Sequence, residues 1–201
     1  MSLVNLARAL LVVSASGLTS AQVPPRSTVP TPGCEAPVWR DHVTAFTRRI
    51  DAYVALRSRL QAELPPQAAT QDSTEAEATR RALAERIRAA RTRARQGDLL
   101  TPALSLEIKK SLRREIDAHT WKVIMDDNPG ELPSQVNDDY RDGMPLSTMP
   151  PNILTALPKL PAGIEYRFVE RHLILLDTTA MLILDRIPFA IAYSNREKSC
   201  R

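Results

Sequence analysis

Residues 165–187, EYRFVERHLILLDTTAMLILDRI, carry the strongest fold signal of the chain. Three short runs rich in β-branched, aromatic and other apolar residues lie in it, at 165–169, 172–176 and 181–187. Polar residues separate the runs at Glu170-Arg171 and at 177–180, as in the turns between antiparallel strands. The pattern predicts a three-stranded antiparallel β-meander within residues 163–188. A single apolar helix over 172–187 is the alternative, because leucine and methionine are also good helix formers.

Both faces of this predicted meander are apolar. Successive residues of a strand point to opposite sides of a sheet, so four leucines share one face: Leu173, Leu175, Leu182 and Leu184. Ile174 and Ile183 lie on the other face. A sheet that is apolar on both sides needs a cover on each. One face is expected to pack on the helices of the chain, and the other on the proline-rich connector, a second copy or a partner. The four leucines are the candidate interaction face.

Proline divides the preceding part of the chain. Three windows contain none, and apolar residues recur in each at helical spacing: 38–64, 67–101 and 103–128. Gly97 suits the position that ends the second helix, and Thr101 with Pro102 suits the start of the third. Short connections favour antiparallel neighbours, so residues 38–128 are predicted to form a three-helix bundle.

From Pro129 onward proline becomes frequent again, and residues 129–162 are predicted to be an irregular connector. Pro150-Pro151 predicts one short helix within it, ending near Leu157. Residues 189–201 form a C-terminal tail. The predicted fold class is α+β, with an antiparallel three-helix bundle, a Pro-rich connector and a small three-stranded antiparallel β-meander.

Residues 1–21 have the features of a signal peptide. Arg8 precedes a short apolar run, and Thr19-Ser20-Ala21 fits the small-x-small rule for signal peptidase. Residues 22–37 follow as a Pro-rich linker. The sequence therefore predicts export, to the periplasm or the medium. The alternative is an amphipathic N-terminal helix that packs on a cytosolic core.

Cys34 and Cys200 are the only cysteines. An oxidising compartment would allow them to form a disulfide between the start and the end of the exported chain. Two unpaired thiols are the alternative, since pairing cannot be deduced from sequence. Neither cysteine has the spacing of a zinc or redox motif.

The chain has a formal net charge of +4, and its second helical window is rich in arginine. A basic surface formed by Arg81, Arg88 and Arg95 would suit an anionic partner. However, arginines flank both sides of the apolar seam, and Glu77 lies four residues before Arg81, which favours an ordinary salt-bridged face. Export argues against a nucleic-acid partner, and a membrane surface remains an alternative.

No pattern of residues predicts catalysis. The histidines are scattered, at His42, His119 and His172, and His119 is expected on the apolar side of its helix as a partly buried structural residue. The aspartate pairs near 126 and 138 lack the spacing of a calcium loop. No nucleophile elbow, metalloprotease motif or phosphate loop is present. We therefore expect no enzymatic activity and no cofactor.

Two resemblances accompany this pattern. Tyr166–Val169, Leu173–Asp177 and Leu182–Ile187 resemble the C-terminal meander of a periplasmic nickel/cobalt-homeostasis family, with Thr178-Thr179-Ala180 where that family often has a glycine. No metal ligand carries over. The run from Gln96 to Pro151 resembles exported bacterial proteins of unknown function, which implies export and no mechanism.

Taken together, the sequence predicts an exported, non-enzymatic envelope protein that acts by binding an envelope protein or by self-association. The alternative is a periplasmic metal-responsive or chaperone-like helical protein. Metal handling would require clusters of histidine, cysteine or methionine, and Met144 and Met149 are the only methionines close in sequence.

Overall fold

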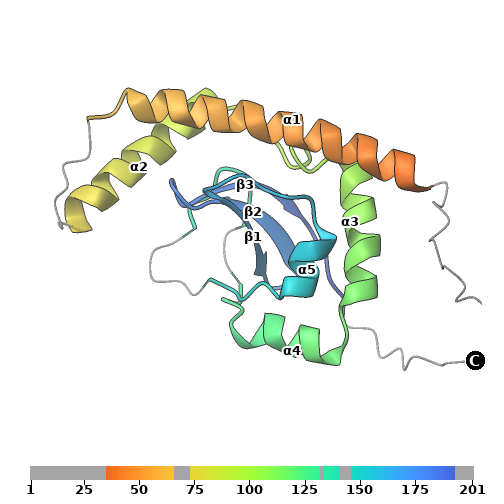
Figure 1. Cartoon of the computed structure of the whole chain (residues 1–201). Coiled ribbons are helices and arrows are strands. Elements are labelled where there is room, and N and C mark those ends of the chain that lie inside the picture. Colours follow the sequence, from red (N-terminus) through yellow and green to blue (C-terminus); the bar gives the residue numbers. More distant parts are fainter. Residues whose placement is uncertain (1–34, 66–72, 132–133, 141–145, 193–201) are drawn as a thin grey trace, which may run out of the picture. The chain divides into compact units, whose positions relative to one another are not determined.

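The computed structural model of the chain describes residues 35–65, 73–131, 134–140 and 146–192. All of these belong to one compact unit. The helices are α1 (Glu35–Ala62), α2 (Ser73–Ala90), α3 (Pro102–Glu115), α4 (Ala118–Asp126) and α5 (Pro151–Ala156). The strands are β1 (Ile164–Val169), β2 (His172–Asp177) and β3 (Leu182–Ile187). Helices are thus followed by a sheet, as Figure 1 shows, and the α+β class is confirmed.

The sheet is the predicted meander. Its strand order is β1-β2-β3, and both pairs are antiparallel. The two turns contain residues with positive φ, Glu170 at 51° and Met181 at 49°. These turns reverse the chain where polar residues interrupt the apolar runs, so the alternative of one helix over 172–187 is wrong.

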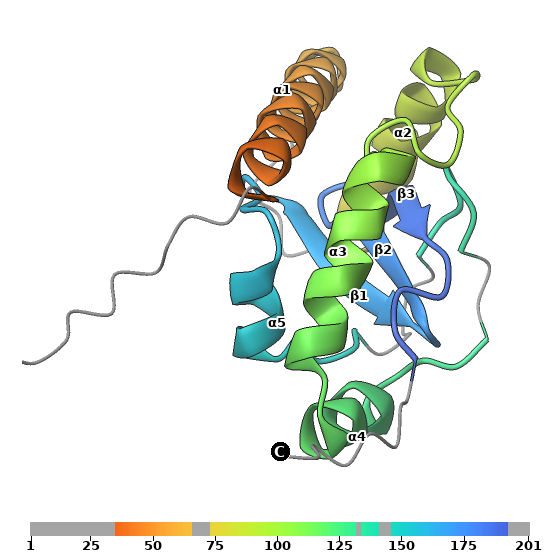
Figure 2. The same ribbon diagram turned by 90° about the vertical axis from the view of Figure 1, so that its right-hand side faces the viewer.

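The helices cover one face of the sheet. The larger apolar core contains side chains of all five helices, including Phe46 of α1, Ile87 of α2, Ile108 of α3, Ile124 of α4 and Ile153 of α5. The same core contains inward side chains of all three strands, such as Phe168, Leu173 and Leu184. Figure 2 shows α3 in front of the sheet, with α1 and α5 beside it.

The connector covers the opposite face of the sheet. A second, smaller cluster joins Tyr140 to Val169, Ile174, Leu176 and Ile183. Residues 134–140 also extend the sheet beyond β3: the Asn137 N–H donates to the Ile183 carbonyl oxygen at 2.8 Å, and the Ile183 N–H donates to the Asp138 carbonyl oxygen at 2.9 Å. Both faces are therefore buried within one chain, as expected, and the connector provides the second cover.

Two helix boundaries differ from the prediction. The window 103–128 is not one helix, because Ile116 is extended (φ −88°, ψ 103°) and Asp117 caps a new helix, α4. The second helix ends at Ala90, before the predicted stop at Gly97. Gly97 instead has φ 93° and donates its N–H to Asp185 Oδ1 at 2.9 Å. Tertiary hydrogen bonding to the sheet thus replaces the last predicted turns of the second helix.

Two fully buried carboxylates fasten the helical part to the sheet. Asp177 Oδ2 accepts the Tyr53 hydroxyl at 2.5 Å, and Asp177 Oδ1 accepts Arg57 Nη1 at 3.2 Å. Burial, together with the Asp177 charge, raises the pKa of Tyr53. Asp185 accepts the N–H groups of Gly97, Leu99 and Leu100. Burial raises the pKa of Asp185 despite these hydrogen bonds. Such buried charges must be hydrogen-bonded, and here their partners fix helix and loop positions.

Candidate functional site

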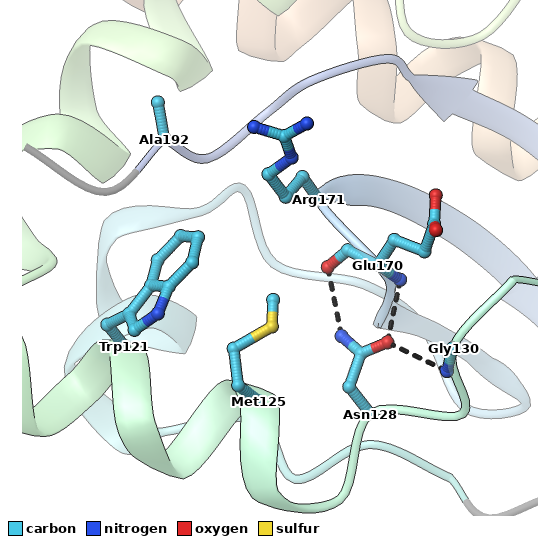
Figure 3. Close-up of a pocket in the computed structure, with 7 residues that line it drawn as sticks. All are labelled: Trp121, Met125, Asn128, Gly130, Glu170, Arg171 and Ala192. Atoms are coloured by element: carbon cyan, nitrogen blue, oxygen red, sulfur yellow. Dashed lines mark hydrogen bonds between the residues drawn. The ribbon is translucent and has the colours of Figure 1, made fainter.

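An open hollow of about 560 Å³ lies between α4, the β1–β2 turn and the chain that follows β3. Figure 3 shows its walls. The lining residues are Trp121, Met125, Asn128, Gly130, Glu170, Arg171 and Ala192. They come from three separate parts of the sequence, so only the folded chain assembles the hollow.

The break between α3 and α4 positions the apolar wall of the hollow. The Asp117 carboxylate accepts the N–H of Thr120 at 2.8 Å. Its hydrogen bonds with the backbone and the side chain of Thr120 lower the pKa of Asp117. Trp121 and Met125 are four residues apart in α4 and therefore lie on one side of it. Ile124 is fully buried and holds the helix against the rest of the fold.

Asn128 connects α4 to the β1–β2 turn. Its Nδ2 donates to the Glu170 carbonyl oxygen at 2.9 Å, and its Oδ1 accepts the Glu170 N–H at 2.7 Å and the Gly130 N–H at 3.2 Å. Figure 3 shows the three hydrogen bonds. One amide side chain thereby fixes the position of the turn relative to the helix, so the two walls of the hollow are joined.

Phe189 stands beside the hollow as an exposed aromatic side chain. Its side chain is exposed (63%), and its backbone has φ 48°, a conformation that bulky residues rarely adopt. The neighbouring Ala190 and Ile191 are buried and anchor the segment. Arg171 lies over the Phe189 ring, with its guanidinium carbon 5.6 Å from the ring centroid.

His172 makes two further contacts with Phe189. The Phe189 N–H donates to His172 Nδ1 at 3.0 Å, and the two rings meet edge to face at 4.9 Å. Burial and the charge of Arg186 lower the pKa of His172 below its usual range, and Glu170 opposes this shift. The neutral imidazole, which is the form that accepts the Phe189 N–H, is therefore favoured.

The predicted interaction face is part of the intramolecular core. Leu173, Leu175, Leu182 and Leu184 are each fully buried (0% exposed) and pack in the cluster that contains the helices. The structure thus corrects their assignment as a surface open to a partner. The physical reason is that the helices already supply the cover that this face needs.

The three arginines of the predicted basic surface differ in exposure and in their hydrogen-bond and ion-pair partners. Arg81 is exposed and pairs with Glu77, as expected for a salt-bridged helix face. Arg88 is half-buried, donates through Nε to the Asn137 carbonyl oxygen at 2.9 Å and pairs with Asp139. Arg95 is exposed in the loop after α2. Because Arg88 fastens the connector, the three do not act as one free basic surface.

The remaining predictions concern the cysteines, the leader, His119 and a metal site. Cys34, Cys200, the leader 1–21 and most of the linker 22–37 lie outside the described residues.

His119 is exposed, so the expectation that it is partly buried is wrong, because α4 starts a new helix with a different orientation. Within the described ranges no three His, Cys, Asp or Glu side chains are placed to hold a metal ion. Every helix in those ranges is too short or too polar to span a bilayer.

Sequence reasoning did not find the hollow. Trp121 and Met125 are four residues apart in one helical window, but no pattern in the sequence links them to Glu170, Arg171 or Phe189. The sequence indicates one part of the site, Glu170-Arg171, and only as a turn between two strands. The signal that would have drawn attention to the site is Phe189 directly after Pro188, in a segment assigned to the tail.

Comparison of the chain with family models, with curated proteins and with solved structures found no match in any of the three.

Proposed function

We propose that this chain is an exported envelope protein that acts by binding another protein at the hollow, and that it does so without catalysing a reaction. The observation that carries the proposal is the combination of Trp121 and Met125 in the wall with the exposed Phe189, which contacts the lining residue Arg171. Export is supported by the leader pattern of residues 1–21.

The size and lining of the hollow fit a binding role. Sites that enclose a ligand group are typically about 300–1,000 Å³ and mostly apolar with a few placed polar groups, and this hollow has about 560 Å³. Tryptophan, phenylalanine and methionine are enriched in protein interfaces, where methionine adapts its shape to the partner. An apolar side chain of a partner would remove Trp121 and Met125 from water.

Phe189 adds an independent argument. Holding a bulky residue at positive φ costs about 1–3 kcal/mol, and such strain is concentrated at ligand clamps and switch regions. Phe189 has this strained backbone conformation and is nevertheless exposed (63%). A ring with no external partner would gain by turning inward, so its exposure supports a role in contact with another molecule.

The test is selection of phage-displayed random peptides on the immobilised full chain. We expect enrichment of peptides that bind the wild type, and roughly thirtyfold weaker binding to Met125→Glu, equivalent to an interface hot spot of about 2 kcal/mol. Leu106→Glu is the control, because Leu106 is an exposed apolar residue (55%) in the first half of α3 and does not line the hollow. Equal binding to Met125→Glu, or no enrichment on the wild type, would overturn the proposal.

A further inference from the structure

We infer that the hollow recognises an acidic peptide segment, in which a carboxylate adjoins an aromatic or aliphatic side chain. Arg171 would take the carboxylate, and Trp121 with Met125 would take the apolar side chain. This inference rests on the proposed function and names the chemistry of the partner.

Arg171 is the cationic residue among those that line the hollow. Figure 3 places its guanidinium on the Ala192 side, across from Trp121 and Met125. Within the part of the chain that the structure describes, this guanidinium makes no hydrogen bond or ion pair; its one contact is the Phe189 ring at 5.6 Å. A contact of the guanidinium carbon with a ring uses no N–H donor, and the N–H donors of a guanidinium match both oxygens of a carboxylate.

Asn128 and Glu170 provide the other polar side chains of the lining. Asn128 uses Nδ2 and Oδ1 in the hydrogen bonds that fix the β1–β2 turn. The Glu170 carboxylate lies 3.7 Å from His172 Nε2 and extends away from Trp121 in Figure 3. The Asn128 side chain is therefore engaged within the chain, and the Glu170 carboxylate points away from the apolar wall.

Charge complementarity decides the sign of the partner. Arg171, Arg186 and Lys109 all act on His172 to lower its pKa, and Glu170 is the carboxylate that opposes them. These three cations come from the β1–β2 turn, β3 and α3. Arg171 is the one of them that lines the hollow, and its guanidinium suits an anionic group of a partner.

The test follows Trp121 emission in a full chain that carries Trp39→Phe, because Trp39 and Trp121 are the only two tryptophans. The ligands are three synthetic peptides that share Gly-Ser flanks and contain Phe-Glu, Phe-Gln or Ala-Glu at the centre. We expect Phe-Glu to bind most tightly. Phe-Gln should bind about tenfold more weakly through loss of a charge-assisted hydrogen bond. Ala-Glu should lose affinity to a similar degree.

Two charge-removing variants locate the effect. Arg171→Gln is expected to abolish the difference between Phe-Glu and Phe-Gln. Arg81→Gln removes the same charge from an exposed position on α2 and is expected to preserve the difference. Equal affinity of the wild type for Phe-Glu and Phe-Gln would overturn the inference.

Further outcomes separate this inference from the proposed function. If both Phe peptides bind equally and both are lost in Met125→Glu, the acidic preference is wrong while protein binding at the hollow stands. If neither Phe peptide binds, and phage selection also fails, both are wrong. A change in Trp121 emission with phosphatidylglycerol vesicles that the Phe-Glu peptide does not reverse would assign Arg171 to a lipid surface and overturn the inference.

Discussion

The pair formed by His172 and Phe189 shows how one side chain can control an exposed one. Neutral His172 accepts the Phe189 N–H at 3.0 Å and packs edge-on against the ring. A protonated imidazole has no free acceptor, so it cannot make this hydrogen bond. The cations Arg186, Arg171 and Lys109 disfavour protonation and Glu170 favours it, with burial as the largest cause of the lowered pKa. The placement of Phe189 therefore depends on the charge of His172.

We expect the stability of the chain to respond to this titration. A histidine whose pKa is lowered on folding contributes stability that is complete above its unfolded value of 6.5 and is lost as the pH falls through the folded pKa. The free energy of unfolding should therefore decrease below pH 6.5, by no more than about 1.4 kcal/mol per pH unit for one proton. His172→Asn keeps an acceptor at this position but does not titrate, so its stability should vary less with pH in urea unfolding.

His119→Asn is the control for this measurement, because His119 is exposed on α4. Its unfolding free energy should follow that of the wild type across the same pH range. An identical pH dependence of His172→Asn and the wild type would show that His172 does not carry the effect.

At the scale of elements, Arg91, the residue directly after α2, connects the proline-rich connector to the sheet. Arg91 donates to Asn137 Oδ1 at 3.3 Å and to the Leu184 carbonyl oxygen at 3.0 Å, and its own carbonyl oxygen accepts Asn137 Nδ2 at 3.2 Å. Its guanidinium lies over the Tyr53 ring. Burial lowers the pKa of Arg91. The hydrogen bonds and the ring contact compensate for the partial desolvation of its charge.

Arg91→Gln should loosen residues 134–140 and lower the free energy of unfolding by about 1–3 kcal/mol, the cost of leaving buried hydrogen-bonding groups unpaired. The Ile183 N–H, which donates to the Asp138 carbonyl oxygen, should exchange with solvent faster. Arg93→Gln is the matched control, because Arg93 is exposed two residues further along the chain. Unchanged exchange at Ile183 in Arg91→Gln would contradict the role of Arg91.

Some of these elements could be predicted from the sequence, and others could not. The strands, the short helix at Pro150-Pro151 and the start of α3 at Thr101 depend on local patterns, and each prediction is confirmed. The early end of α2 depends on the carboxylate of Asp185, which is 95 residues beyond Ala90. The hollow likewise depends on contacts between distant segments. Local periodicity contains no information about such partners, so the boundaries and the site could not be predicted.

At the scale of the whole described unit, helices and sheet share one core. The main cluster joins all five helices, α1 to α5, to inward side chains of β1, β2 and β3. A second cluster joins the connector to the outer face of the sheet. The sheet therefore lies between two covers that come from the same chain, and neither cover can leave without exposing leucine and isoleucine side chains to water.

Leu175→Asp tests this shared core. Leu175 is fully buried on β2, opposite Tyr166 on β1 and Asp185 on β3. An unpaired carboxylate there costs several kcal/mol, a large part of the about 5–15 kcal/mol that stabilises a typical domain. We expect helical circular dichroism and tryptophan emission to be lost together. Leu146→Asp, at an exposed position (43%), should remain folded. Retention of the helical signal in Leu175→Asp would mean that the helices do not depend on the sheet, and the four leucines would again qualify as a surface for a partner.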